Sequence, residues 1–304
     1  MPRSLFIALF LLSLIWGGSY FFIKILLHDF GPWTIAFLRS SLGLAAIVII
    51  MLVLRIPFAF RQIRWIPMVV MALINTAIPW AIIGFSETRL TSTMASVLNA
   101  TTPLWTMVVG ILFFQAVANR LQWIGMGIAI VGLIILLGVN THSLISVDLL
   151  GFICMVAASL CYAIGSQLSK RLSKGLSMYQ ITFGTLLSAM LGSGSVAFLT
   201  EPIAFSHLAS LPNIAALAGL GIFGSGIAYI LFYFIVQKGS PEFATMVTYL
   251  IPASAMIWGY TMLNEQIHWS LLTGLVLILG GVFLAGRTRS NALPTSALNK
   301  KALQ

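Results

Sequence analysis

The chain has 304 residues, of which 60% are hydrophobic and 7% carry charge, with a mean hydropathy of +1.04 and a formal net charge of +10 at pH 7. A water-soluble protein of this composition would have too few polar side chains to cover its surface. The composition therefore excludes a soluble enzyme or binding protein and predicts a polytopic membrane protein.

Ten apolar stretches follow one another along the chain, most of them near the roughly 20 residues that a helix needs to cross a bilayer. They cover residues 5–27, 32–54, 65–86, 92–114, 121–138, 149–169, 177–199, 213–237, 241–263 and 270–286. None shows the alternation of a membrane β-barrel, so we predict an all-α fold with ten transmembrane helices. The first stretch is longer than a signal-peptide core and has no small-residue cleavage site, which favours a transmembrane helix.

Positive charge is concentrated at one set of helix ends. Thirteen of the sixteen Lys and Arg residues lie there, Arg3, Arg55 and Arg120 among them, whereas the opposite ends hold Lys24 and Arg89. Because cytoplasmic loops retain positive charge, we expect both termini in the cytoplasm. The same rule accounts for the basic net charge, so the expected partner is the lipid bilayer and not a nucleic acid.

The second half of the chain repeats the pattern of the first. A shift of 149 positions places residues 72–137 on 221–286 without a gap, and a shift of 146 places Trp16 on Tyr162. Each copy contains five predicted helices, an odd number, so the second copy must enter the membrane inverted relative to the first. Inverted repeats are common in secondary transporters, whose substrate sites lie near the midplane between the copies.

These patterns set the predicted domains. The first repeat covers residues 5–140 and the second covers 147–287. Residues 288–304 are polar, and we predict a disordered cytoplasmic tail.

Proline lies inside three of the predicted helices. The prolines are Pro79, Pro103 and Pro252, four residues after Asn75, Asn99 and Thr248. Proline frees the carbonyl four residues before it, and such a group at membrane depth must face protein or a water-filled cavity. Two interpretations stay open: the freed carbonyls help to form a binding site, or nearby polar side chains satisfy them at a simple kink.

Aromatic and polar side chains lie at comparable depths in several of the helices. Rings of Trp and Tyr with scattered amides and hydroxyls suit a small solute that is zwitterionic or has an apolar body. The predicted substrate-binding residues are Trp16, Tyr20, Asn75, Trp80, Asn99, Tyr162, Gln167, Tyr229, Thr248 and Tyr249, with Arg39 as a further candidate.

Arg39 is a charge inside a predicted span, roughly 10 Å deep at 1.5 Å per residue. Its guanidinium could hold a substrate carboxylate or phosphate. Alternatively, its side chain extends to the outer headgroups or pairs with a loop acid such as Glu87 or Asp29. Glu265, at the end of the ninth helix, is either a gate partner for a basic residue or a solvated helix end.

Acidic residues are missing from the middle of the predicted spans. This pattern disfavours the efflux of cationic drugs and proton antiport through a buried carboxylate. The histidines lie outside the spans, and we find neither a metal-ligand spacing nor the HExxH and GxSxG motifs of hydrolases. We therefore expect no enzyme activity, no metal and no cofactor.

Several landmarks together resemble the EamA family of the drug/metabolite transporter superfamily, in its bacterial ten-helix form. They are the segment WGGSYFFIK at residues 16–24, the prolines within helices, the Asn264-Glu265-Gln266 close of the ninth helix, and glycine-bearing fifth and tenth helices. The first repeat departs from the pattern, because Gln115 and Ala116 stand where the second has Asn264 and Glu265.

The resemblance implies a secondary transporter in a bacterial inner membrane. Such a protein would export or exchange a small metabolite, often an amino acid, by alternating access. Two alternatives stay open: an exchanger of phosphorylated or nucleotide-linked metabolites, and a membrane receptor that does not transport. We expect a monomer or a weak homodimer.

Overall fold

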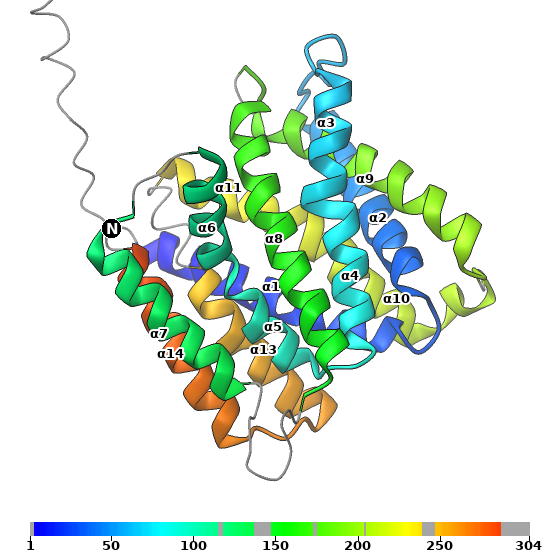
Figure 1. The fold of residues 1–304 in the computed structure, drawn as a ribbon. Coiled ribbons are helices and arrows are strands. Elements are labelled where there is room, and N and C mark those ends of the chain that lie inside the picture. Colours follow the sequence, from blue (N-terminus) through cyan, green and yellow to red (C-terminus); the bar gives the residue numbers. More distant parts are fainter. Residues whose placement is uncertain are drawn as a thin grey trace, which may run out of the picture.

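The computed structural model describes residues 3–114, 118–136, 147–172, 175–203, 205–238 and 247–286, so the predicted tail at 288–304 lies outside the described residues. All regular structure in these ranges is helical (Figure 1). Seven helices or continuous helical runs are long and apolar enough to span a membrane, and three shorter apolar helices accompany them. The protein is thus an all-α, polytopic membrane protein.

The first half contains the helices of the first predicted repeat. They are α1 (Arg3–Leu26), α2 (Pro32–Val53), α3 (Trp65–Ala72), the π-helical segment η1 (Leu73–Ala77), α4 (Ile78–Glu87), α5 (Ser92–Asn99), α6 (Thr102–Phe114) and α7 (Arg120–Leu136).

The second half of the chain contains the corresponding helices of the second predicted repeat. They are α8 (Leu149–Leu172), α9 (Met178–Thr200), the short 3-10 helix η2 (Phe205–Ala209), α10 (Leu211–Leu217), the π-helical segment η3 (Ala218–Ile227), α11 (Ala228–Lys238), α13 (Val247–Leu263) and α14 (Trp269–Gly286).

One predicted span is two helices. The stretch 92–114 divides into α5 and α6 at Ala100 and Thr101. Pro103 is the second residue of α6, a position where its missing N–H removes no helical hydrogen bond. The predicted kink is therefore a helix break, located just before the proline.

Two other spans contain π-helical turns at matching places. Under the 149-position shift, η1 falls within η3, so both repeats widen the helix at the same level. Such turns leave part of the backbone irregular and are often found at functional sites. Pro79 follows η1, but Ala228 occupies the equivalent position after η3, so proline alone does not explain the widening.

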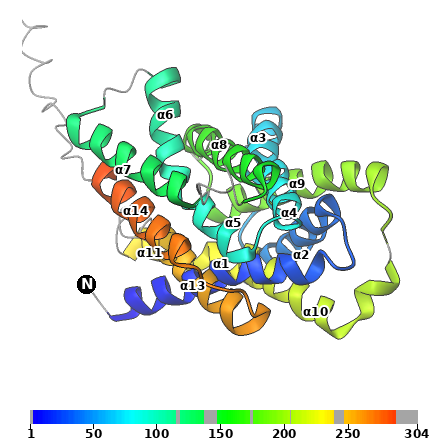
Figure 2. The ribbon, with the colours of Figure 1, turned by 60° about the horizontal axis from the view of Figure 1, so that its bottom comes forward.

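The structure contains the predicted inversion. Helices α7 and α14 lie side by side in two views (Figures 1 and 2). A Cβ atom added to Gly125 would lie 2.5 Å from the carbonyl oxygen of Gly281, and one added to Gly132 would lie 2.9 Å from that of Gly274. The residue numbers rise in one helix as they fall in the other, so these equivalent helices run antiparallel.

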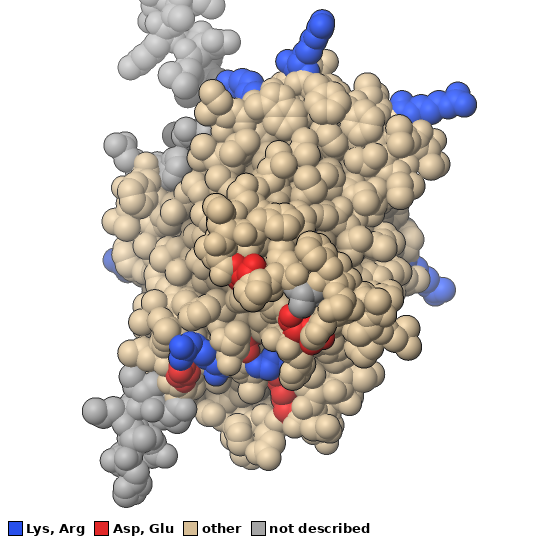
Figure 3. Space-filling view, turned by 90° about the vertical axis from the view of Figure 1, so that its right-hand side faces the viewer, with Lys and Arg blue, Asp and Glu red and all other residues tan. Residues whose placement is uncertain are grey.

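Charged residues separate the two ends of the helix bundle. We call the end that holds Asp29, Glu87, Asp148, Glu201 and Glu265 the acidic end, and the end that holds Arg55, Arg61, Arg64 and Arg120 the basic end. Figure 3 shows Lys and Arg side chains projecting from the upper part of one face, and acidic side chains on its middle and lower part, with further Lys and Arg side chains beside them. Large apolar side chains such as Phe6, Leu199 and Trp269 are exposed between the ends, as lipid contact requires.

Candidate functional site

A cavity of about 860 Å³ lies between the two halves. All but one of the predicted binding residues line it: Trp16, Tyr20, Arg39, Asn75, Trp80, Asn99, Tyr162, Tyr229, Thr248 and Tyr249. Gln167 belongs to α8, but its side chain is outside the described part of the structure. Pro103 and Pro252 also border the cavity, whereas Pro79 is buried within α4. The sequence pattern therefore located residues that the fold brings together.

The carbonyl freed by Pro103 has a local partner. The Thr102 hydroxyl donates a hydrogen bond of 2.7 Å to the carbonyl oxygen of Asn99. The Asn99 carbonyl is thus satisfied by a nearby hydroxyl at the break between α5 and α6. Asn99 still contributes to the cavity as a lining residue, so its place in the candidate site depends on its position and not on a bare carbonyl.

Two related aromatic pairs come from the two repeats. The Trp16 indole N–H donates a 3.1 Å hydrogen bond to the Gly224 carbonyl, and its ring meets Tyr229 edge-on at 6.2 Å between centroids. The equivalent residues are Tyr162 and Trp80, which both line the cavity. The cavity is thus bordered by aromatic groups from both halves.

Glycine allows the helices that carry these pairs to approach closely. A Cβ atom added to Gly165 would lie 2.5 Å from that of Asn75, and one added to Gly224 would lie 3.2 Å from the Ser19 hydroxyl. Ser19 and Gly165 are equivalent under the 146-position shift, and Asn75 and Gly224 under the 149-position shift. Each contact therefore pairs one glycine with one polar side chain, at matching places in the two repeats.

Arg39 is buried in the site, with 7% of its surface exposed. Its Nε donates a 2.9 Å hydrogen bond to the Ser225 hydroxyl, and its Cζ lies 3.8 Å from the centroid of the Trp80 ring. The loop-acid interpretation is wrong, because Asp29 binds His207 and the Glu87 carboxyl has no hydrogen-bond partner among the described residues. The burial of Arg39 argues against its extension to the headgroups.

The positive charge of Arg39 is not balanced by a nearby negative charge among the described residues. Among the described residues, no carboxylate lies within 4.0 Å of the guanidinium. A buried cation is costly unless it is paired, and stacking on the face of Trp80 offsets only part of that cost. The site is therefore chemically suited to an anionic group.

Glu265 joins the segment after α13 to the start of α5 at the acidic end. Its carboxylate accepts hydrogen bonds from the backbone N–H groups of Ser92 at 2.7 Å and Thr93 at 3.0 Å, and from the Thr93 hydroxyl at 2.5 Å. Anions at a helix N-terminus are stabilised by the unpaired N–H groups and by the helix dipole. Of the two alternatives from the sequence, a basic partner and a solvated helix end, neither describes this contact, because the partner is the first turn of α5.

Glu201 makes the same contact with α2, and sequence reasoning missed it. Its carboxylate accepts hydrogen bonds from the N–H groups of Trp33 at 3.0 Å and Thr34 at 2.8 Å, and from the Thr34 hydroxyl at 2.7 Å. Glu201 and Glu265 each follow a transmembrane helix, and each faces the beginning of another helix that carries a threonine. That shared placement is the sequence signal that could have identified both.

The cavity extends unequally toward the two ends. Toward the acidic end its lining includes Ile23, Ile83 and Ser96, which lie deeper in the bundle than the contacts of Glu265. Toward the basic end it reaches the beginning of α7 and the end of α14, through Ala118, Gln122, Val282 and Ala285. Sequence reasoning missed this last group because three of its members are aliphatic. The cavity therefore reaches the basic end and is covered at the acidic end.

The fold and cavity define a polytopic membrane protein with a central polar chamber between two inverted halves. The model of the EamA-like transporter family matches the chain twice, over residues 3–138 and 149–287. The chain belongs to this family of transporters.

Relatives of similar length support the assignment. The inner membrane transporter YedA of Escherichia coli (strain K12) is 29% identical over 96% of this chain and 94% of its own. The transporter YoaV of Bacillus subtilis (strain 168) is 21% identical over 90% and 93%. A solved crystal structure shares the fold with a TM-score of 0.66 at 16% identity, over 94% of this chain and 96% of that one.

Proposed function

We propose that this protein is a secondary transporter that exports or exchanges a small carboxylate-bearing metabolite, an amino acid or a related compound, by alternating access. The observation that carries the proposal is the buried Arg39 guanidinium in the cavity wall, without a carboxylate partner among the described residues. A substrate carboxylate would supply the missing countercharge.

The rest of the cavity supports a small amphipathic substrate. Its volume of about 860 Å³ falls within the range of small-molecule sites. Trp16, Trp80 and Tyr229 offer aromatic surface, and Asn75 and Asn99 offer amide groups for hydrogen bonds. An ammonium group could lie against the ring faces through cation–π attraction.

A phosphorylated or nucleotide-linked substrate receives less support. Two or more charges on a phosphate group call for several cationic side chains. Arg39 is the cationic residue in the described lining of the cavity, and the other lining residues are neutral.

The charge distribution supports an inward-facing state in a bacterial inner membrane. Placing the basic end in the cytoplasm satisfies the positive-inside rule. The cavity would then be accessible from the cytoplasm, with the contacts of Glu265 closing the opposite side. Export would require the reverse arrangement, in which the acidic end opens and the basic end closes.

Efflux from proteoliposomes tests the proposed substrate class. Vesicles would be loaded with a labelled amino acid or with the corresponding amine, which lacks the carboxylate. We expect efflux of the amino acid and not of the amine, and Arg39→Gln should lower kcat/KM for the amino acid by roughly 100-fold, the loss of a buried charge-assisted pair.

Arg89→Gln is the matched control, since Arg89 is an exposed arginine that pairs with Asp148 away from the cavity. It should transport like the unaltered protein. Equal efflux of amine and amino acid, or full activity of a folded Arg39→Gln protein, would contradict the proposal. Binding of a ligand without any movement across the membrane would favour the receptor interpretation.

A further inference from the structure

Glu87 is a buried carboxyl group that the proposed substrate site does not use. It is the last residue of α4, its exposed fraction is 0%, and neither carboxyl oxygen has a hydrogen-bond partner among the residues that the structure describes. The sequence placed it in a loop beyond the predicted span 65–86, whereas the structure makes it the last residue of α4 and buries it. An ionised carboxylate without partners is costly in such a place, so the group needs a physical explanation.

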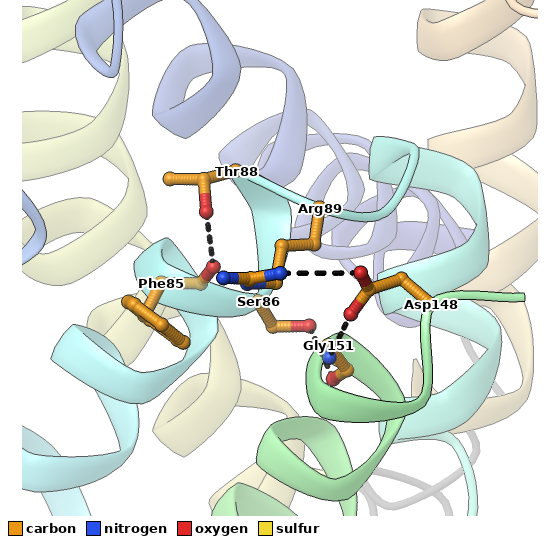
Figure 4. A network of polar contacts seen from close by, with 6 residues as sticks. All are labelled: Phe85, Ser86, Thr88, Arg89, Asp148 and Gly151. Atoms are coloured by element: carbon orange, nitrogen blue, oxygen red, sulfur yellow. Dashed lines mark hydrogen bonds and ion pairs between the residues drawn. The ribbon is translucent and has the colours of Figure 1, made fainter.

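Charged side chains from three other elements act electrostatically on Glu87. They are Lys24 of α1, Arg39 of α2 and Glu265 in the segment after α13. On the α8 side, the nearby acid Asp148 is already paired with Arg89 at 3.2 Å (Figure 4). The helices therefore meet at Glu87 with charges of both signs nearby, yet none of these groups hydrogen-bonds its carboxyl oxygens.

Lys24 contacts backbone carbonyls and not the carboxyl group of Glu87. Its ammonium donates one hydrogen bond to the backbone carbonyl of Glu87 and another, of 2.8 Å, to that of Leu90. An ammonium this close to an ionised carboxylate would gain more by pairing with it, because both groups would then carry charge. The observed arrangement fits a neutral carboxylic acid. It also joins α1 to the last carbonyl of α4, where a cation is favourable, and to the turn that follows α4.

A second contact holds the same part of α4. The Ser86 hydroxyl donates a 2.8 Å hydrogen bond to the carbonyl of Gly151 at the start of α8, beside the Arg89–Asp148 pair (Figure 4). Thus α4 ends against α1 on one side and α8 on the other. Glu87 lies one helical turn beyond Ile83, which lines the cavity, so it belongs to the layer that covers the cavity at the acidic end.

We propose that Glu87 is a proton-binding site whose protonation holds the acidic end closed. When this end opens and water reaches the carboxyl group, its O–H bond breaks, the electron pair stays on the carboxylate and the proton passes to water. A glutamic acid in water has a pKa of about 4.3, so an exposed Glu87 would ionise at neutral pH. Lys24 then moves from the backbone carbonyls of Glu87 and Leu90 to the new carboxylate, so the hydrogen bonds that held α1 against the turn between α4 and α5 are lost.

The consequence is a gate that responds to pH. Closing this end takes up one proton, so acid at the acidic end favours the closed state by up to tenfold per pH unit. This gating rests on the proposed transport function, whereas the protonation of Glu87 does not. It also restores a role for protons that the sequence pattern disfavoured.

Efflux from oriented proteoliposomes tests the gate, with pH varied on the side of the acidic end. We expect efflux by the unaltered protein to slow as this side is acidified. Glu87→Gln, which mimics the neutral acid, should transport slowly and without this dependence. Glu201→Gln is the matched control, because Glu201 is a fully hydrogen-bonded carboxylate at the same end, and this variant should keep the dependence. Unchanged pH dependence in Glu87→Gln would overturn the gate.

Infrared difference spectroscopy of the purified protein tests protonation without transport. At neutral pH we expect the carbonyl stretching band of a protonated carboxylic acid in the unaltered protein and in Glu201→Gln, but not in Glu87→Gln. Absence of the band from the unaltered protein would overturn the proton site even if efflux occurs. Presence of the band in a protein that transports nothing would support the proton site and contradict the proposed function.

Discussion

The two ends of the cavity are built from equivalent segments of an inverted repeat, but they are closed differently. At the acidic end, the Glu265 carboxylate binds the first turn of α5 through three hydrogen bonds. The equivalent residue of the first repeat is Ala116, which has no group that could make this contact. A duplicated fold can thus supply two similar arrangements of helices while its side chains make one of them more stable.

This difference gives alternating access a specific physical basis. In the present structure the cavity reaches the basic end, and charge-assisted hydrogen bonds hold the acidic end. The balance between the two states would then depend on a few carboxyl groups. Removing them one at a time should show which of them control access and which only stabilise the fold.

The largest effect is expected from Glu265→Gln. The substitution removes the negative charge opposite the first turn of α5 and costs the closed acidic end about 1.4 kcal/mol, a shift of roughly tenfold in the equilibrium between states. Distance measurements between spin labels across the acidic end should show the open population rise. An unchanged distance distribution would show that this contact does not control access.

A smaller effect, of a different kind, is expected from Glu201→Gln. Its carboxylate stabilises the start of α2, which packs along α9 on the far side of the bundle from α5. Loss of this cap should lower the free energy of unfolding by about 1 kcal/mol and the melting temperature by a few degrees, without a change in access. A shift in the spin-label distances as large as that of Glu265→Gln would mean that both caps act as gates.

The smallest effect is expected at Asp29, on the surface of the acidic end. Hydrogen bonds from Asn213 and then His207 lower the pKa of Asp29 below its ordinary value of 3.8. A group whose pKa is lowered by folding stabilises the protein above its unfolded pKa, and this stabilisation is lost as the pH falls through the folded value.

The Asp29→Asn variant should therefore match the unaltered protein more closely below pH 4 than at pH 7 in thermal melts. The difference at pH 7 should be small because the pair is exposed to solvent. A difference that grows as the pH falls would contradict this explanation.

The helices and most of the lining were predictable because a bilayer imposes simple rules. An amide or an indole in the middle of an apolar run, such as Asn75, Asn99 or Trp80, has few favourable places except an internal cavity. The inversion was predictable from the odd number of helices in each repeat, and the contacts between α7 and α14 show it. These features depend on local sequence and on the solvent.

Features that depend on contacts between distant segments were not predictable. Glu87 lies one residue beyond its predicted span, and it is buried because α1, α5 and α8 pack around the end of α4. Arg39 was found, but its contacts with Trp80 and Ser225 join residues about 40 and 190 positions away. Nor does a carboxylate at a helix end reveal which N-terminus it will face.

Labelling of a single cysteine in the cavity, from each side of the membrane, tests the central claim most directly. Met107 lines the cavity on α6, so Met107→Cys would be made in a background in which Cys154 and Cys161 are alanine. We predict that an impermeant maleimide reacts from the side of the basic end and that a transported amino acid slows the reaction. Labelling from the acidic end alone, or labelling that the amino acid does not affect, would contradict it.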